Sequence, residues 1–429
     1  MMTKSPNKMG LTTQILLGMF AGILAAMLLR NLLPGSEWVQ TLFTDGIFNV
    51  LGSVFVSALR MLVVPLVFVS LVCGTCNLSE PSKLGRLGGK TVALYLLTTA
   101  IAISVAMAAA ILIHPGSASL QQEEMAFAAK EAPSLAQVVI DLVPRNPLAA
   151  MVEGNMLQII VFAIIFGFAI AQLGDKTRQV RALFNELNEV VLKIVNIVMI
   201  LAPFGVFGLI AKLGMTLDLA AFESVVKYFF VVLGVLIFHA LVVYPLLLSV
   251  VGGQNPITFL KKMASVQMYA FSTASSAATL PITMDNAEKR LGVHNRVGSF
   301  TLPLGATVNM DGTAIMQGVA TIFIAQVFNV DLSVADMLMV ILTATLASIG
   351  TAGVPGVGLI MLAMVLQQVG LPVEGIALIL GVDRLLDMVR TAVNITGDSA
   401  VSVIVAKSEG ELDAEVYGNP DAGAEPQRA

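Results

Sequence analysis

Seven polar side chains interrupt an apolar stretch of membrane length between residues 375 and 405. Read as an α-helix at about 100° per residue, all of them except Arg384 fall within an arc of roughly 100°. Facing lipid, the five ionisable groups in this stretch would cost about 12 to 17 kcal/mol, whereas its aliphatic side chains recover only about 4 to 8. We therefore expect this face to line a polar site. The seven side chains are Asp383, Arg384, Asp387, Arg390, Thr391, Asn394 and Asp398.

The residue types on this face indicate ligand binding. A guanidinium holds a carboxylate through two parallel hydrogen bonds, so Arg390 favours an acidic ligand. An unpaired Asp387 would suit an ammonium group, which favours an amino acid over a plain dicarboxylate. The alternative is a structural ion pair between Asp387 and Arg390, but such a pair does not explain Asn394 and Asp398. Ionisable groups inside a membrane are by default candidates for a substrate or ion pathway.

A second polar element lies inside the apolar run from residue 300 to residue 327. Gly305 and Gly312 flank Asn309 and Asp311 there. This pattern predicts an unwound helix whose free carbonyls and carboxylate offer hard oxygen ligands, which suit sodium. Asp311 as the N-cap of the following half-helix is the alternative, and the two roles are compatible. Further hydroxyls stand at helical spacing in an earlier span, at Tyr95, Thr98 and Thr99.

The composition is that of a polytopic membrane protein. Hydrophobic residues make up 57% of the 429 residues and charged residues 12%, and the mean hydropathy is +0.87. The net charge of −4 is spread over loops and an acidic tail, so no basic surface suggests nucleic acid. The three histidines are scattered, and Cys73 and Cys76 lack the further ligands that a tetrahedral metal site needs. We expect these cysteines to pack as small apolar side chains.

Charge distribution predicts the topology. Basic residues cluster near 4–8, 83–90, 176–181 and 261–262, whereas the intervening loops are mainly acidic, so these basic ends and both chain termini should face the cytoplasm. The segment 134–173 exceeds one span and is broken at 144–147. Spans are expected at 11–33, 44–76, 89–113, 134–173, 181–213, 222–252, 300–327 and 375–405.

Two further segments should enter the bilayer and return to the same side. Residues 256–288 have basic residues at both ends and a hydroxyl-rich turn at 272–279. Residues 335–369 have acidic residues at both ends and four glycines with a proline within 350–358. Two opposed hairpins indicate inverted repeats with a site at the midplane. The predicted fold class is an all-α polytopic membrane protein with eight transmembrane helices and two re-entrant helical hairpins.

Four motifs, in this order, are similar to those of the glutamate/aspartate and dicarboxylate cation symporter family, which includes the excitatory amino acid transporters. The resemblance covers residues 11–408. The motifs are the serine-rich tip from Ser275 to Pro281, Asn309 to Thr313, the glycine-rich tip from Gly350 to Gly358, and Asp387 to Thr391 with Asn394 to Asp398.

The resemblance implies an elevator-type transporter that forms a homotrimer in the plasma (inner) membrane. It implies a fixed scaffold, a moving transport domain and no cofactor, with Na⁺ as the coupling ion. The expected domains are a cytoplasmic N-terminus (1–10), scaffold helices 1–2 (11–76), transport-domain helix 3 (77–115), scaffold helices 4–5 (116–213), a transport domain (214–408, with hairpins at about 256–291 and 335–369) and a disordered cytoplasmic tail (409–429).

The resemblance also implies roles for individual residues. Arg390 would bind the side-chain carboxylate of the substrate, and Asp387 its α-amino group. The remaining substrate contacts would be Ser275, Ser276, Thr313, Val354, Gly358, Thr391 and Asn394. The sodium ligands would be Gly305, Asn309, Asn394 and Asp398 in one site, Thr307, Met310, Ser348, Ile349 and Thr351 in another, and Tyr95, Thr98, Thr99, Asn309 and Asp311 in a third.

One departure from the family pattern concerns an arginine near the substrate aspartate. Relatives carry it just before the serine pair or just after that aspartate, where this chain has Ala274 and Met388. We hypothesise that Arg384, three residues before Asp387, replaces it.

The leading hypothesis is a sodium-coupled symporter for L-aspartate or L-glutamate. A C4-dicarboxylate or proton-coupled symporter is the alternative, although proton-coupled relatives tend to lack a carboxylate at the position of Asp398. Two other classes are an intramembrane aspartyl protease built on Asp311 and a passive channel, which two opposed gates disfavour. The sequence does not separate aspartate from glutamate, which differ by one methylene.

Overall fold

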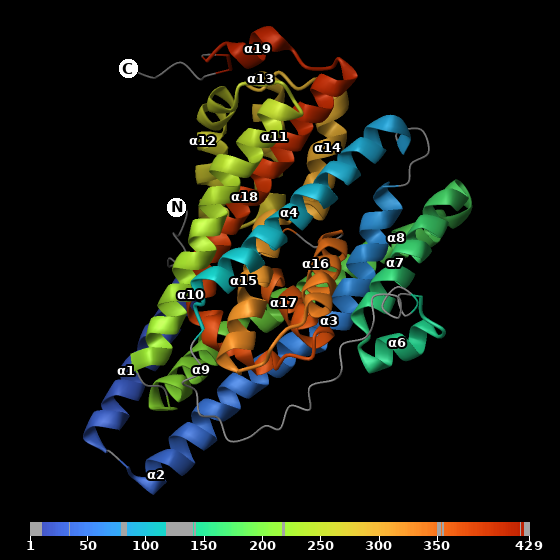
Figure 1. Cartoon of the computed structure of the whole chain (residues 1–429). Coiled ribbons are helices and arrows are strands. Elements are labelled where there is room, and N and C mark those ends of the chain that lie inside the picture. The colour runs from blue at the N-terminus through green and yellow to red at the C-terminus, as the bar shows by residue number, and fades with distance from the viewer. Residues whose placement is uncertain are drawn as a thin grey trace, which may run out of the picture.

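The computed structural model describes residues 11–33, 35–78, 84–116, 140, 143–216, 219–349, 353, 356–420 and 422–423. Within these residues the backbone is almost entirely helical (Figure 1). The one β-type pairing among them is an isolated bridge between Val293 and Leu412. The all-α fold class is therefore confirmed for the described part of the chain.

One group of helices comes from the first half of the chain. In this group α1 packs along α9, and α3 packs against α7, α8 and α9. Its members are α1 (Leu11–Leu32), α2 (Glu37–Val39), the π-helical η1 (Gln40–Phe48), α3 (Asn49–Leu78), α6 (Pro147–Glu153), α7 (Met156–Leu173), η3 (Gly174–Thr177), α8 (Arg178–Ile200) and α9 (Ala202–Thr216).

A second group surrounds the long helix α18 (Ile376–Glu409), which contacts α10, α12, α14 and α15. Its α4 comes from the first half of the chain and packs against α15 and α16. The other members are η2 (Leu84–Gly88), α4 (Gly89–Ile113), α10 (Leu219–Phe238), the π-helical η4 (His239–Val243), α11 (Tyr244–Val250), α12 (Pro256–Thr273), α13 (Ser276–Lys289), α14 (Asn295–Val308), α15 (Asp311–Val327), α16 (Val334–Ser348), α17 (Val357–Gln368), η5 (Val373–Gly375) and α19 (Ala414–Gly418).

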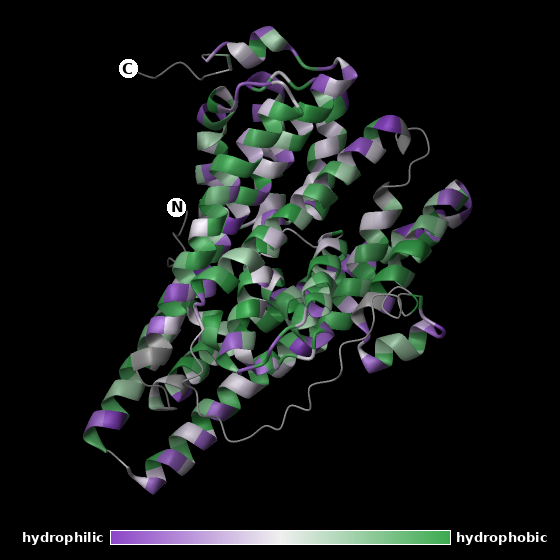
Figure 2. Ribbon diagram, in the orientation of Figure 1, coloured by the Kyte–Doolittle hydropathy of each residue, from purple (hydrophilic) through white to green (hydrophobic). Residues whose placement is uncertain are grey.

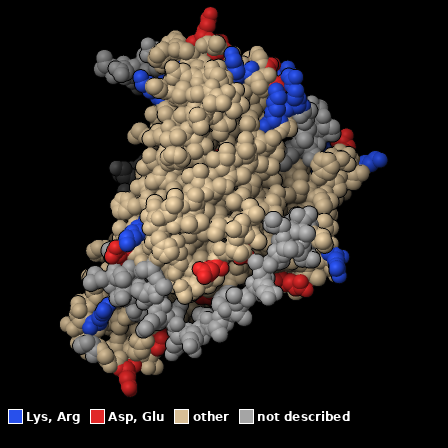
Figure 3. Space-filling view, in the orientation of Figure 1, with Lys and Arg blue, Asp and Glu red and all other residues tan. Residues whose placement is uncertain are grey.

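The surface suits a bilayer. Apolar ribbon fills the middle of the molecule (Figure 2), and in the space-filling view Lys, Arg, Asp and Glu gather towards the two ends (Figure 3). Five helical runs among the described residues are long and apolar enough to cross a membrane, fewer than the eight spans expected. One run, Gln158–Ile200, covers parts of two predicted spans, 134–173 and 181–213. The two spans predicted in the last third do not qualify, because α14 and α15 are separate short helices and α18 carries five charges in its middle. The five runs are Thr13–Leu32, Glu37–Cys76, Arg86–Ile113, Gln158–Ile200 and Glu223–Val250.

The chain breaks where the sequence predicts breaks. Helices α12 and α13 form a contacting pair joined at Ala274 and Ser275, and Ala274 adopts a left-handed φ of 49°. Helices α16 and α17 form a second contacting pair. Between α14 and α15 the helix unwinds at Asn309 and Met310. Asp311 is the first residue of α15 and Met310 is its N-cap, so the alternative that Asp311 is the N-cap is wrong.

Residues 409–429 were expected to be disordered, and the described part of this segment, residues 409–420 and 422–423, is instead structured. Gly410 ends α18 with a left-handed φ of 73°, and the N–H of Glu411 bonds to the carbonyl of Ala406 at 2.8 Å, so the chain reverses there. It continues through Leu412 into α19, which Asp413 caps. The polar, acidic composition of this segment suggested disorder. However, the side chain of Tyr417 is only 3% exposed, and its burial holds the segment against the rest of the molecule.

Candidate functional site

The middle of α18 holds four charged side chains in mutual contact. Arg390 lies 2.9 Å from a carboxylate oxygen of Asp383 and donates to Asp387 at 2.9 Å. Arg384 donates to the second oxygen of Asp387 at 3.1 Å. Because an α-helix presents residues i, i+4 and i+7 on one face and places Arg384 three residues before Asp387, α18 itself brings these groups together. The structural Asp387 and Arg390 pair is thus present, and Asp387 is not unpaired as the sequence suggested.

Arg390 retains unused hydrogen-bonding capacity. Its side chain is completely buried, yet neither Nε nor Nη1 has a hydrogen-bond acceptor in the described part of the chain. The 2.9 Å contact of Nη1 with Asp383 is an ion pair without hydrogen-bond geometry, since the Asp383 oxygen is also unsatisfied. A buried polar group without a partner costs free energy. This guanidinium therefore offers donors to an anionic ligand.

Two turns further along α18, a carboxylate lies among neutral groups. Asp398 is 2% exposed and accepts from the Nδ2 of Asn309 at 2.8 Å. The same amide donates to the carbonyl of Asn394 at 3.0 Å, and Asn394 Oδ1 accepts from the N–H of Gly312 at 2.7 Å. The unwound segment and α18 are thus joined by side-chain amides.

Asp311 is a second buried carboxylate with hydroxyl partners. Thr99 donates to one of its oxygens at 2.6 Å, and Tyr244 donates to the other at 2.8 Å. The Nε2 of His239 lies 3.3 Å from that second oxygen, while the Nδ1 of His239 has no partner among the described residues. Helix α4, the π-helical turn η4 and α15 therefore meet at this carboxylate.

The region around Asn309 has the donor set that a sodium ion requires. The Oδ1 of Asn309 is buried and has no hydrogen-bond partner in the described part of the chain. Among the described residues, neither Asp311 nor Asp398 forms an ion pair with Lys or Arg. Buried carboxylates are costly unless a cation compensates them. Hard oxygen atoms with this uncompensated charge fit an alkali cation that arrives as a transported ion.

The tips of the two hairpins meet beside α18. Ser275 Oγ donates to the carbonyl of Gly353 at 2.7 Å, and the N–H of Ala277 donates to the same carbonyl at 3.3 Å. Ser275 also caps α13 by accepting from the N–H of Ala278. These contacts bring segments 78 residues apart in sequence into one junction.

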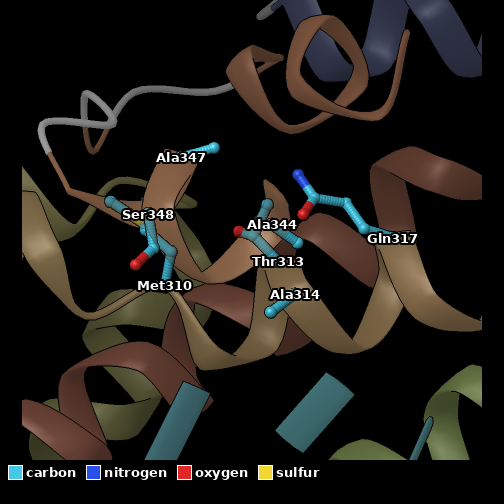
Figure 4. Close-up of a pocket in the computed structure, with 7 residues that line it drawn as sticks. All are labelled: Met310, Thr313, Ala314, Gln317, Ala344, Ala347 and Ser348. Carbon is cyan, nitrogen blue, oxygen red and sulfur yellow. The ribbon is translucent and has the colours of Figure 1, made fainter. Parts of the chain in front are cut away.

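Two cavities adjoin these groups. One small cavity lies between α15 and α16, where Figure 4 shows Thr313 and Gln317 near Ala344 and Ser348. The other is lined by Asp383, Arg384 and Asp387 on one side. Its remaining lining comes from Ile15, Phe55, Met199, Ala202, Gly356, Leu359 and Leu380. It therefore separates the charged turn of α18 from α1, α3, α8 and α9.

Comparison with known proteins identifies the family to which this arrangement of a broken helix and a polar helix face belongs. Residues 11–408 match the sodium:dicarboxylate symporter family. The chain belongs to this family. A symporter is a transporter that moves a solute together with an ion, so the protein is not an enzyme and the aspartyl protease alternative is wrong.

Curated members of this symporter family resemble the chain over most of its length. The proton/sodium-glutamate symport protein of Bacillus caldotenax is 34% identical, over 95% of this chain and 97% of that protein. An excitatory amino acid transporter of Caenorhabditis elegans is 36% identical, over 85% of this chain and 82% of its own. The C4-dicarboxylate transport protein of Rhodospirillum rubrum is 35% identical, over 85% and 83% respectively. The chain is thus an integral membrane symporter.

Some residues that the resemblance assigns to ligands are brought together in this symporter. Gly305, Asn309, Asn394 and Asp398 form one cluster, since a methyl group on Gly305 would lie 2.6 Å from the Asp398 carboxylate. Thr99 joins Asp311. Met310, Thr313 and Ser348 line the smaller cavity. A methyl group on Gly358 would lie 3.3 Å from Thr313 and 3.6 Å from Arg390.

Other assigned hydroxyls bond to backbone carbonyls instead. Tyr95 donates to Thr301 O at 3.0 Å, Thr98 to Tyr95 O at 3.0 Å, Thr307 to Leu304 O at 2.9 Å, Ser348 to Thr345 O at 2.7 Å and Thr391 to Asp387 O at 2.9 Å. Ser276 and Ile349 are buried. Val354 and Thr351 lie outside the described residues.

Sequence reasoning missed two residues of the site. His239 was set aside as one of three scattered histidines, and Tyr244 was not considered, although both contact Asp311. The available signal was an imidazole inside an apolar run, since polar groups at membrane depth are rarely incidental. The π-helical turn η4, which carries His239 and ends next to Tyr244 of α11, has no comparable sequence signature.

Proposed function

We propose that the protein imports an acidic amino acid, L-aspartate or L-glutamate, together with sodium ions. The observation that carries this proposal is the pairing of two complementary deficits on α18. Arg390 is buried with unused donors, and Asp398 is buried without a cationic partner. An anionic substrate would satisfy the first and a sodium ion the second. Binding of each would favour binding of the other, because the acidic substrate and the sodium ion carry opposite net charges and bind one to two turns apart on the same helix.

In this proposal Arg390 holds the substrate side-chain carboxylate and Asp387 its ammonium group. Thr391, Asn394 and the hairpin tips would complete the substrate contacts. The sodium ligands would come from the three predicted sets, with Asp311 and Asp398 supplying the negative charge. The hairpin serines Ser275, Ser276 and Ser348 would help to position the ligands and would supply no charge.

A C4-dicarboxylate is the second candidate substrate. It is favoured by the contacts of Asp387, which already accepts from both Arg384 and Arg390 and so has less capacity for an ammonium group than an unpaired carboxylate. A relative named as a C4-dicarboxylate transport protein supports the same candidate. Proton coupling, which the names of other relatives include, is the alternative to sodium.

Uptake into proteoliposomes separates these candidates. Labelled L-aspartate and labelled succinate would be offered under an inward sodium gradient, an inward proton gradient or neither. We expect accumulation of aspartate with sodium alone. Accumulation of succinate but not aspartate would indicate a dicarboxylate transporter instead. Accumulation with a proton gradient alone would contradict the sodium assignment. Equilibration without accumulation would indicate a channel.

We further propose an elevator mechanism, in which the group around α18 is the transport domain and the α1, α3, α7, α8 and α9 group is the scaffold of a homotrimer in the inner membrane.

Arg60 of α3 contacts Glu374 at 2.5 Å. At about 1.5 Å per residue, Arg60 lies roughly 35 Å from Glu37 and 24 Å from Cys76, near the middle of its span. Glu374 belongs to a turn expected outside, so this contact supports an inward-displaced state.

Charge reversal tests this assignment. Arg60→Glu and Glu374→Arg should each change the uptake rate by about two- to five-fold, because half-exposed ion pairs are worth roughly 0–1 kcal/mol. The double reversal should restore the rate. If the double variant loses as much of the uptake rate as the two single variants combined, the contact does not bias transport.

A further inference from the structure

The cytoplasmic base of the first hairpin contains a buried lysine whose charge is held by backbone carbonyls. Lys262 of α12 is 1% exposed. Its Nζ donates to the carbonyl oxygens of Arg290 at 2.6 Å, Val416 at 2.7 Å and Tyr417 at 2.9 Å. Two of these three acceptors belong to the C-terminal segment. Lys262 therefore ties the hairpin to the end of the chain.

The same C-terminal segment contacts the hairpin at several other points. Tyr417 donates to the carbonyl of Asn255 at 2.9 Å, and its ring centroid lies 5.9 Å from Lys262 Nζ. Asp413 N–H donates to the carbonyl of Gly292 at 2.8 Å. Gly292 has a φ of 69°, and a methyl group there would lie 2.5 Å from the carbonyl oxygen of Asp413. The approach at Gly292 is thus too close for any other residue.

The segment also holds the start of α14. The N–H of His294 donates to the carbonyl of Glu411 at 3.0 Å, next to the bridge between Val293 and Leu412. Arg296 lies 3.4 Å from the Glu411 carboxylate. Residues 411–417 therefore contact the start of α12, the segment that follows α13 and the start of α14. They continue directly from α18.

We propose that residues Glu411–Tyr417 are a clasp that fixes the base of the α12 and α13 hairpin to α14 and α18, with Lys262 as its central contact. The hairpin, α14 and α18 then move as one body. Ser275 and Ser276 lie at the opposite end of the hairpin, its tip. By fixing the base of the hairpin, the clasp fixes the position of this tip relative to α18. This last consequence rests on the proposed transport function, whereas the clasp itself does not.

Hydrogen exchange of the full-length protein in nanodiscs tests the clasp. Lys262→Met removes the ammonium group and keeps the apolar stem, and Lys261→Met is the matched control because Lys261 is the exposed neighbour. We expect exchange at residues 256–262 and 287–293 to accelerate at least ten-fold in Lys262→Met and to stay within two-fold of wild type in Lys261→Met. Equal exchange in the two variants would overturn the proposal.

A second pair of variants keeps the test decisive if Lys262→Met does not fold. Tyr417→Phe removes only the bond to Asn255, and a chain ending at Gly410 removes the clasp. Exchange at the hairpin base should rise in the order wild type, Tyr417→Phe, truncated chain. Unchanged exchange in the truncated chain would overturn the clasp, whether or not that chain transports. Faster hydrogen exchange at the hairpin base with an unchanged KM for aspartate would support the clasp and contradict its effect on the hairpin tip.

Discussion

Two regions of α18 solve the problem of buried charge in opposite ways. Between Asp383 and Arg390, two carboxylates face two guanidinium groups and the formal charges cancel. Between Asn394 and Asp398, a carboxylate is buried beside amides, and the nearby Asp311 is buried beside hydroxyls and a histidine. The first region is compensated by its own helix. The second needs a positive charge from outside the chain.

Under the proposed function, this difference would let one helix bind two kinds of solute. In the compensated region an incoming carboxylate would compete with Asp383 and Asp387 for Arg390, so substrate binding would be an exchange of partners. In the uncompensated region a cation would neutralise buried negative charge, so its binding should also stabilise the fold. The two regions are one to two turns apart, close enough for their electrostatic interaction to be weakly screened.

The largest expected effect comes from neutralising the second region. Asp398→Asn should reduce sodium-driven uptake by about two to four orders of magnitude, since a missing partner of a buried charge pair costs roughly 3–5 kcal/mol. The melting temperature without sodium should not fall, because the variant buries one charge less. Sodium should raise it less than in the wild type, because the other two proposed sodium sites do not include Asp398. Asp285→Asn, in an exposed pair with Lys289, is the control, and an Asp398→Asn protein that sodium stabilises as much as the wild type would contradict the comparison.

The next effect comes from changing the cation of the first region. Arg390→Lys keeps the charge but loses the planar pair of donors. We expect the KM for aspartate to rise about 10- to 100-fold, because charge-assisted hydrogen bonds contribute roughly 1.5–3 kcal/mol. Sodium-induced stabilisation should persist, measured by thermal melting. Arg178→Lys, at the exposed start of α8, is the control. An unchanged KM would show that Arg390 is purely structural.

A smaller effect should follow from unbalancing the first region. Arg384→Ala removes one of the two arginine contacts of Asp387 and leaves the region with a net negative charge. We expect a change of about three- to ten-fold in aspartate KM, with the pH dependence of uptake altered as well. If transport and affinity stay as in the wild type, Arg384 does not replace the arginine absent at Ala274 and Met388.

The smallest effect concerns the C-terminal end of α18, where charges are paired but exposed. Hydrogen bonds from Arg86 and Lys90 lower the pKa of Glu409 from 4.5 to about 2. This stabilisation is present above pH 4.5 and is lost as the pH falls towards 2, because the unfolded chain binds the proton first.

Thermal melting of Glu409→Gln and wild type should therefore differ by about 1–3 °C at pH 7 and converge as the pH falls to about 2. Glu153→Gln, an exposed change in α6, should show no such convergence. A difference that grows as the pH falls would contradict the assigned direction.

Much of the site could be predicted from the sequence because the cost of burying charge is independent of the fold. Five ionisable groups in an apolar run identified the polar face of α18, and glycine next to Asn309 and Asp311 identified the break between α14 and α15. The partners of these groups could not be predicted in the same way. That His239 and Tyr244 reach Asp311 depends on how α10, η4 and α11 pack against α15.

The sequence by itself determined the all-helical fold class and where helices break, and it predicted the ligand chemistry, since helix breaks and charge burial depend on local residue types. The tertiary structure decided which charges are already compensated. It pairs Asp387 with Arg384 and Arg390, leaves Asp398 among neutral groups, and turns the C-terminal residues into a segment that buries Lys262. Electrostatic compensation requires distances of about 3–4 Å, and residues far apart in sequence reach such distances only when the helices are packed.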